Sequence, residues 1–192
     1  MKLAWLVAVA ACASSPPAPP SNPSPVAPAP AAPEPIAKPC AGPEYRQLDF
    51  WLGDWTVEVH ARAKLGSDQW ADAHATQHVT TTLKGCAVEE NFASAPPVAF
   101  AGRSFSTFDA ITKKWRQTWV DDSGGYLAFT GGPEGDGFAL YGEPRDAGGV
   151  KFQMRMVWSK ITHDSMRWEW QRSDDNWATN QVMIAGDYTR AH

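Results

Sequence analysis

The sequence predicts an all-β domain in which about ten antiparallel strands close into an up-and-down barrel. Segments of five to ten residues alternate apolar and polar side chains, which is the period of a strand with one buried face. Short links rich in Gly, Pro or Asp separate them, so neighbours in sequence should pair. Helix signals are scarce beyond a short turn near residue 50. Many strands without covering helices tend to close, because closure removes exposed edges. An open sandwich is the alternative.

The first twelve residues have the pattern of an export signal. Met1 and Lys2 precede the apolar run Leu3–Ala11, which is too short to span a bilayer. The run continues into Cys12 through small residues, in the manner of a bacterial lipobox, whose cysteine receives the lipid. We therefore expect residues 1–12 to be a lipoprotein-type signal peptide ending at a lipidated Cys12. Ordinary cleavage after Ala11 or Ala13 is the alternative.

Residues 13–39 form a linker in which proline dominates. Eleven of the 16 prolines of the chain lie between Pro16 and Pro39, with almost no large apolar residue between them. Such a segment cannot offset its ordering entropy by packing, and it favours polyproline II at about 3.1 Å per residue. We expect a disordered, semi-rigid tether that joins a lipid anchor to an envelope protein facing the periplasm or the cell surface.

Composition excludes several classes of partner. The net charge is −4, and the chain has no run of Lys or Arg. A nucleic-acid binder needs a basic stripe, and attraction to anionic lipid needs a polybasic patch. No stretch reaches the roughly 18 apolar residues of a transmembrane span. We expect membrane contact only through the lipid anchor, and the sequence leaves the oligomeric state open.

The three cysteines point to one disulfide. Cys12 is either lipidated or removed with the signal, which leaves Cys40 and Cys86 as an even pair in an oxidising compartment. We expect them to form a bridge, with two separate buried thiols as the alternative. Neither cysteine has the CxxC spacing of a metal site.

The domain of residues 40–192 begins with a short helical turn. Residues 43–51 place Leu48 and Trp51 on one side of it, and Gly53-Asp54 ends it. The glycine-rich segment 131–137 is expected to be a hairpin loop, because it lacks the Lys-Ser/Thr and the helix of a phosphate-binding loop. The expected strands are 55–61, 70–83, 86–93, 99–108, 115–121, 126–130, 138–143, 150–158, 166–172 and 177–188.

The turn that leads into Gly53-Asp54-Trp55 resembles the opening of lipocalin-type barrels, the calycin group. The resemblance implies that Trp55 plugs the base of the barrel and that an Arg near the end of the last strand packs over it. Arg190 is the residue available for that role. A guanidinium further than about 7 Å from the ring would contradict the pairing.

A longer resemblance covers nearly the whole domain. Segments 46–55, 85–92, 104–109, 114–121 and 155–158 resemble a bacterial family catalogued as domain of unknown function fifteen seventy-nine. That resemblance implies exported members and a calycin-like barrel, and it brings no assigned activity. The segment 173–177 looks like a shortened form of the turn found in this family.

Motifs for metal, cofactor or nucleophile chemistry are absent. His74 and His78 fall on the face opposite the apolar residues of their strand, and strand positions four apart are roughly 13 Å apart. We therefore predict a surface pair and no metal site. No Gly-x-Ser-x-Gly elbow occurs, and we predict no cofactor and no catalytic residue.

Strand alternation places a few polar side chains among apolar ones. Glu90 shares a face with Phe92, and Arg103 shares one with Phe105. If these faces are the lumen, a polar cluster lies within aromatic walls, with Glu90 and Arg103 as an ion pair because a buried charge requires a partner. The candidate ligand-binding residues are Glu90, Arg103, Gln117, Trp119 and Asp121. A purely structural ion pair, or outward-facing residues, is the alternative.

Three functions remain open at this stage. The first is an exported, lipid-anchored protein whose barrel binds a small apolar or amphipathic ligand. The second is a filled barrel that serves as a structural or interaction module. The third is an enzyme that uses Glu90 and Asp121 for acid–base chemistry, and it is the least favoured.

Overall fold

The computed structural model describes residues 39–96 and 99–192. The expected signal peptide, the expected lipidation site Cys12 and the linker up to residue 38 lie outside the described residues. Within the described part, no helix has the length and apolar character needed to cross a membrane.

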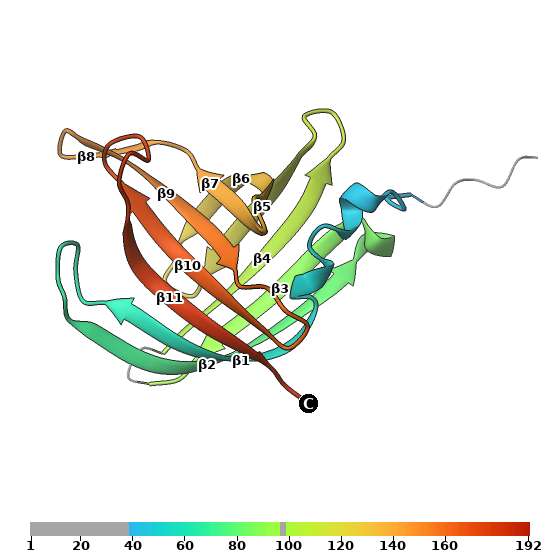
Figure 1. Ribbon diagram of the computed structural model, residues 1–192, viewed down its shortest axis with the longest axis horizontal. Coiled ribbons are helices and arrows are strands. Elements are labelled where there is room, and N and C mark those ends of the chain that lie inside the picture. The colour runs from blue at the N-terminus through green and yellow to red at the C-terminus, as the bar shows by residue number, and fades with distance from the viewer. Residues whose placement is uncertain (1–38, 97–98) are drawn as a thin grey trace, which may run out of the picture. The chain divides into compact units, whose positions relative to one another are not determined.

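The described residues form eleven strands and three short 3-10 turns (Figure 1). The turns are η1 (Pro43–Arg46), η2 (Asp49–Trp51) and η3 (Leu83–Gly85). The strands are β1 (Gly53–Arg62), β2 (Trp70–Thr82), β3 (Ala87–Ser94), β4 (Phe100–Asp109), β5 (Lys114–Asp121), β6 (Tyr126–Glu134), β7 (Gly137–Gly142), β8 (Arg145–Ala147), β9 (Val150–Ser159), β10 (Ser165–Ser173) and β11 (Gln181–Arg190).

Ten of these strands close into an antiparallel barrel, as the sequence predicted. Each pairs with its neighbour in the order β10-β11-β1-β2-β3-β4-β5-β6-β7-β9, and β9 pairs with β10 to complete the ring. The short β8, which the sequence did not predict, pairs only with the start of β9. The fold is therefore a closed barrel and not the open sandwich that was the alternative prediction.

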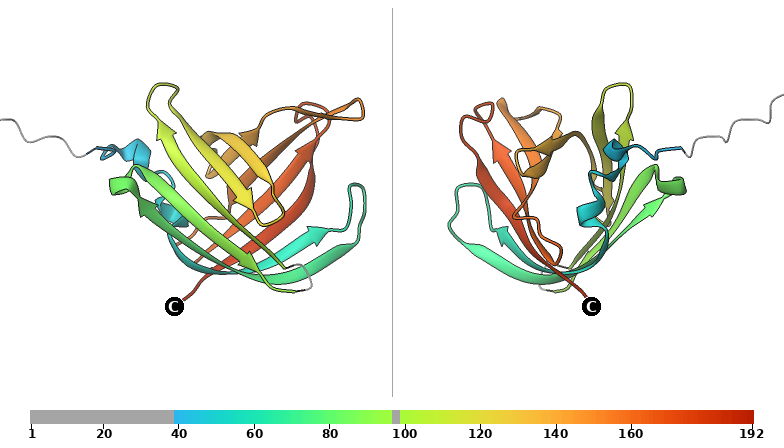
Figure 2. Two further views of the ribbon diagram at one scale, coloured as in Figure 1. Left: turned by 180° about the vertical axis from the view of Figure 1, so that it is seen from behind. Right: turned by 45° about the vertical axis from the view of Figure 1, so that its right-hand side comes forward.

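The N-terminal turns lie at one end of the barrel, beside the β2–β3 connection (Figure 2). We call this the closed end, and we call the opposite end, which carries the β1–β2, β3–β4 and β5–β6 connections, the open end. The closed end is filled by large side chains that are each 1 % exposed or less: Leu48, Trp51, Trp55, Trp115, Phe138 and Trp158. The expected single turn is thus two turns, η1 and η2, which bring Leu48 and Trp51 into this core.

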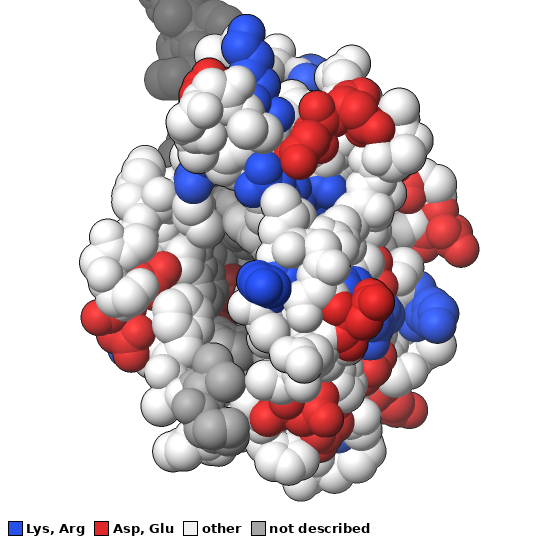
Figure 3. Space-filling view, turned by 90° about the vertical axis from the view of Figure 1, so that its left-hand side faces the viewer, with Lys and Arg blue, Asp and Glu red and all other residues white. Residues whose placement is uncertain are grey.

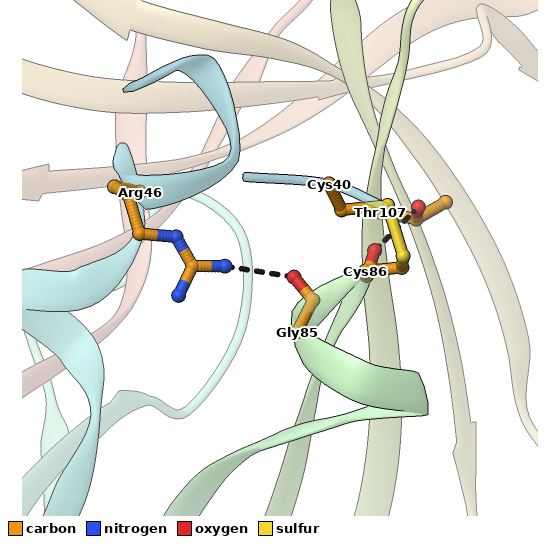
Figure 4. Close-up of a disulfide and its surroundings, with 5 residues drawn as sticks. All are labelled: Cys40, Arg46, Gly85, Cys86 and Thr107. Atoms are coloured by element: carbon orange, nitrogen blue, oxygen red, sulfur yellow. Dashed lines mark hydrogen bonds between the residues drawn. A yellow bond between two sulfur atoms is a disulfide. The ribbon is translucent and has the colours of Figure 1, made fainter. Parts of the chain in front are cut away.

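The predicted bridge between Cys40 and Cys86 is present (Figure 4). It joins the chain just before η1 to the residue that precedes β3. Next to it, Nη2 of Arg46 donates to the carbonyl of Gly85 at 2.7 Å, and Oγ1 of Thr107 donates to the carbonyl of Cys86 at 2.9 Å. The start of the domain is therefore attached covalently to the closed end.

Two boundaries differ from the prediction by more than two residues. Strand β6 runs through most of the expected loop to Glu134, because the glycines there allow a close backbone approach: a Cβ on Gly131 would lie 2.0 Å from the carbonyl oxygen of Ala139. Strand β11 starts at Gln181 and not at Trp177, which has a positive φ of 69° in a turn. Oγ of Ser173 accepts the backbone N–H of Trp177 and holds that turn.

Candidate functional site

A cavity of about 440 Å³ occupies the barrel between the closed-end core and the open end. Strand residues far from the closed end line it, including Ala61 of β1, Phe100 of β4 and Leu127 of β6. Its floor includes Trp158, whose ring contacts Trp51 edge to face at 5.2 Å between centroids. A space-filling view onto the side with the β1–β2 hairpin shows that this face of the molecule is hollowed (Figure 3).

The walls of the cavity are mostly aromatic. The aromatic lining residues are Phe92, Phe100, Trp119, Phe129, Trp158, Trp168, Trp170 and Tyr188. The expected alternation brings them inward, since every second residue of a strand faces the lumen. Trp119 lies directly over Gly102 of the paired strand, where a Cβ would stand 2.0 Å from its ring. Glycine at position 102 therefore makes room for one cavity wall.

Glu90 faces the lumen and is 7 % exposed. Its partner is Ser104 and not Arg103: Oγ of Ser104 donates to Oε2 of Glu90 at 2.5 Å, and the two residues are directly opposite in the β3–β4 register.

The predicted ion pair with Arg103 is wrong because the inner face of β4 consists of Phe100, Gly102, Ser104, Ser106 and Phe108. Arg103 does share a face with Phe105, but that face is the outer wall, where Phe105 is 51 % exposed. The exposed Phe105 thus led to the wrong prediction that the face carrying Arg103 lines the lumen.

Gln77 is a buried polar residue that the sequence reasoning missed. It is 2 % exposed on the inner face of β2. Hydrogen-bond complementarity orients its amide oxygen toward Nε1 of Trp51 at 2.7 Å, and its nitrogen toward the hydroxyl of Tyr188 at 2.7 Å and Oε1 of Glu90 at 3.3 Å. Its odd-numbered position, in phase with Ala73, was the signal available in the sequence. Gln77 connects the closed-end core to the cavity carboxyl.

Burial changes the acidity of this group. Loss of hydration raises the pKa of Glu90 from 4.5 to about 7, against the lowering effect of the Ser104 hydrogen bond. Burial also raises the pKa of Tyr188 well above 10, and the nearby charge of Glu90 adds to that rise. Glu90 can therefore change its charge near neutral pH while Tyr188 stays protonated.

Asp121 and Trp119 lie together on the cavity wall toward the open end. Nε1 of Trp119 donates to Oδ2 of Asp121 at 3.0 Å. Hydrogen bonds from the Ser123 hydroxyl and from the backbone N–H of Gly125 lower the pKa of Asp121. Asp121 is therefore a charged acceptor that also holds the β5–β6 turn.

Gln117 also faces inward but does not line the cavity. It is 3 % exposed, and its Nε2 donates to Oγ of Ser106 at 3.0 Å. Of the five candidate ligand-binding residues, the structure thus brings Glu90, Trp119 and Asp121 to the cavity and places Gln117 in the polar core beside it.

The guanidinium of Arg190 lies 4.2 Å from the ring centroid of Trp55, inside the limit set above. Arg190 also donates to the carbonyls of Leu52 at 2.8 Å and His163 at 2.7 Å. Gly53, with φ of 120°, leaves the space for this guanidinium, because a Cβ there would stand 2.4 Å from Nη1 of Arg190. The Gly and the Trp of the motif therefore both serve the Arg190 contact.

The histidine pair lies on the outer wall of β2, paired with carboxylates of β1. His78 contacts Asp54 at 2.6 Å and His74 contacts Glu58 at 2.8 Å. Within residues 39–96 and 99–192, no three His, Cys, Asp or Glu side chains are grouped as a metal site would require.

A closed antiparallel barrel with a plugged base, an Arg over the base Trp and a central cavity defines the class: this is a calycin-like β-barrel. The chain belongs to the family described as Protein of unknown function (DUF1579), which it matches over residues 41–190. No curated protein matches the chain.

Proposed function

We propose that the barrel binds a small apolar or amphipathic ligand in its central cavity. One observation supports this above the others: a cavity of about 440 Å³ is lined mainly by aromatic and aliphatic side chains, with a few polar groups on its wall. Ligand sites commonly have volumes of roughly 300–1,000 Å³ and this composition. A filled barrel acting as an interaction module is less well supported, because its lumen would be solid.

Native mass spectrometry of the full chain purified from its own host tests the proposal. We expect a bound small molecule that is released on unfolding. Replacing Ile184 on the cavity wall by Trp should reduce the bound fraction, whereas Thr189→Trp on the outer face of the same strand should not. A fully ligand-free spectrum, with equal behaviour of the two variants toward added apolar probes, would contradict ligand binding.

The second part of the proposal is export and anchoring through a lipid on Cys12. The apolar run before Cys12 supports it, and so does the Cys40–Cys86 disulfide, because disulfides persist in oxidising compartments. In this proposal the barrel is tethered in the cell envelope, facing the periplasm or the surface.

Membrane fractionation of host cells tests the anchor. Cys12→Ala should move the protein from the membrane fraction to the soluble fraction and remove the mass of the acyl chains. The matched variant Ala13→Ser should remain in the membrane fraction. Equal fractionation of Cys12→Ala and the unaltered chain would refute the anchor.

Acid–base catalysis is a second candidate, and the acidity of Glu90 favours it. A general acid or base works best with a pKa near the working pH, and Glu90 is at about 7. The pKa of Asp121 is lowered instead, so Asp121 would act only as a fixed negative charge. Chemical conversion of a ligand that copurifies with the protein, lost in Glu90→Gln, is the result expected of an enzyme.

A further inference from the structure

The cavity wall carries negative charge only. Its ionisable lining residues are Glu90, Asp121 and Tyr188, and no Lys, Arg or His is present among the described residues that line it. Arg103, which would have supplied a positive charge, projects from the outer wall. A ligand that enters the lumen therefore meets carboxyl groups and no cation.

Glu90 is held by neutral hydrogen-bond donors. Ser104 donates to one carboxyl oxygen, and the amide of Gln77 approaches the other at 3.3 Å. These groups orient the carboxyl toward the lumen without neutralising it. An ionised carboxylate without a countercharge in an apolar site is costly, and a cation that reaches it recovers part of that cost.

The aromatic rings near Glu90 suit the same kind of ligand. Phe92 lies two residues from Glu90 on the same face, with its ring centroid 6.4 Å from that of Trp119. Tyr188 adds a third ring, next to Gln77. Ring faces attract ammonium groups, and the attraction is strongest where water is excluded. The ring faces and the carboxyl group thus both favour a positively charged ligand.

We propose that the cavity selects an apolar amine, whose ammonium group binds Glu90 while its hydrocarbon body packs against the aromatic wall. This inference rests on the proposed ligand-binding function and adds the charge of the ligand. It separates the protein from a carrier of fatty acids, whose carboxylate would lie against Glu90 and Asp121 without a cation to pair with.

Three probes of equal chain length test the selectivity: 1-aminodecane, 1-decanol and decanoate. Their binding to the full chain is measured at pH 8 by quenching of tryptophan fluorescence and by calorimetry. We expect the amine to bind about tenfold or more tightly than the alcohol, and decanoate to bind at least about tenfold more weakly than the alcohol. Binding of decanoate as tight as that of the amine would overturn the proposal.

The variant Glu90→Gln identifies the group responsible. It keeps the size of the side chain and removes the charge, so the amine should lose about tenfold in affinity and come close to the alcohol. Glu89→Gln is the matched control: it makes the same change of charge one residue away, on the outer face of β3, and should leave the selectivity intact. Equal losses in the two variants would show that net charge, and not Glu90, sets the preference.

The outcomes distinguish the two proposals. If none of the three probes binds, both the ligand-binding function and the selectivity fail. If the three bind equally, the cavity is a ligand site without charge selection, and only the inference about amines fails. The comparison of probes on the unaltered chain does not depend on the variants, so it stands even if Glu90→Gln does not fold.

Discussion

The two ends of the barrel are built from the same strands, with the same alternation of inward and outward residues, yet one is solid and the other is hollow. At the closed end, η1 and η2 add Leu48 and Trp51 to a buried cluster that also contains Trp55 and Trp158. At the open end no such segment is inserted among the described residues, and the inward side chains surround a cavity. Strand pattern alone therefore does not decide whether a barrel is filled. A short inserted segment at one end makes the difference.

The largest expected effect is the loss of Trp51. Trp51→Ala should lower the free energy of unfolding by about 3–5 kcal/mol, since the ring is 1 % exposed and packed on all sides. Trp168→Ala, on the cavity wall, should cost less than half as much, because that ring already borders empty space. Urea unfolding of both variants checks this. Equal losses would mean that the open end is packed as tightly as the closed end.

Removal of the disulfide tests whether the closed end and the open end of the barrel are independent of each other. The double variant Cys40→Ser, Cys86→Ser should lose about 3–4 kcal/mol of unfolding free energy through the 46-residue separation that the bridge closes. Because the bridge is at the closed end, binding of an apolar probe under folding conditions should change little. Addition of a reductant to the unaltered chain should reproduce the loss of stability, and a probe affinity that falls in parallel would show that the two ends are coupled.

The charge of Glu90 should make the stability of the folded chain depend on pH. The pKa of Glu90 is about 7 in the folded state against 4.5 as its ordinary value, so between these values the folded state holds a proton that the unfolded state has released. The free energy of unfolding therefore falls as pH rises from 4.5 to 7, by about 3 kcal/mol in total for this group.

Over this range the other titratable groups of the lumen keep their charge state. Tyr188 stays neutral because its pKa is raised, and Asp121 stays charged because its pKa is lowered. Glu90→Gln should flatten this part of the stability profile, measured by urea unfolding at several pH values, whereas Glu89→Gln should leave it in place. A profile unchanged by Glu90→Gln would mean that the carboxyl is well hydrated.

The smallest expected effect concerns Arg190 over the base of the barrel. Arg190→Lys should cost about 1–2 kcal/mol, because an ammonium group cannot stack on Trp55 and donate to the carbonyls of Leu52 and His163 together. Arg116→Lys, which affects a surface pair between the exposed Arg116 and the half-buried Asp109, should cost at most about 1 kcal/mol. Thermal unfolding measures both. An equal, small loss would mean that Arg190 is merely a surface residue.

Sequence reasoning succeeded where the pattern is local or covalent. The order of ten strands follows from period-two alternation and short links, and Cys40 and Cys86 were the two cysteines left to pair. The contact between Trp55 and Arg190 was predicted from the resemblance to lipocalin-type barrels, which links a Trp in the first strand to an Arg near the end of the last strand. Each of these features depends on few residues and on no detail of packing.

The candidate site was less predictable because a face can be assigned only relative to its neighbours. Phe105 suggested that its face was inside, but Ser104 and Ser106, which are small and polar, are the residues that fit the narrow interior beside Trp119 and Gln117. Gln77 was overlooked because its partners, Trp51 and Tyr188, come from distant parts of the chain. Hydrogen bonds between residues so far apart in the sequence leave no recognisable pattern within a single strand.

The position of the Cys40–Cys86 bridge also determines how the domain responds to mechanical force. Tension applied to the chain before residue 40 passes through the two sulfur atoms to the start of β3, which is paired along its length with β2 and β4. The turns that carry Leu48 and Trp51 lie after Cys40 and are bypassed by this route. Tension from the N-terminal side therefore acts on a sheet in which many hydrogen bonds share the force. Leu48 and Trp51 stay in the closed-end core.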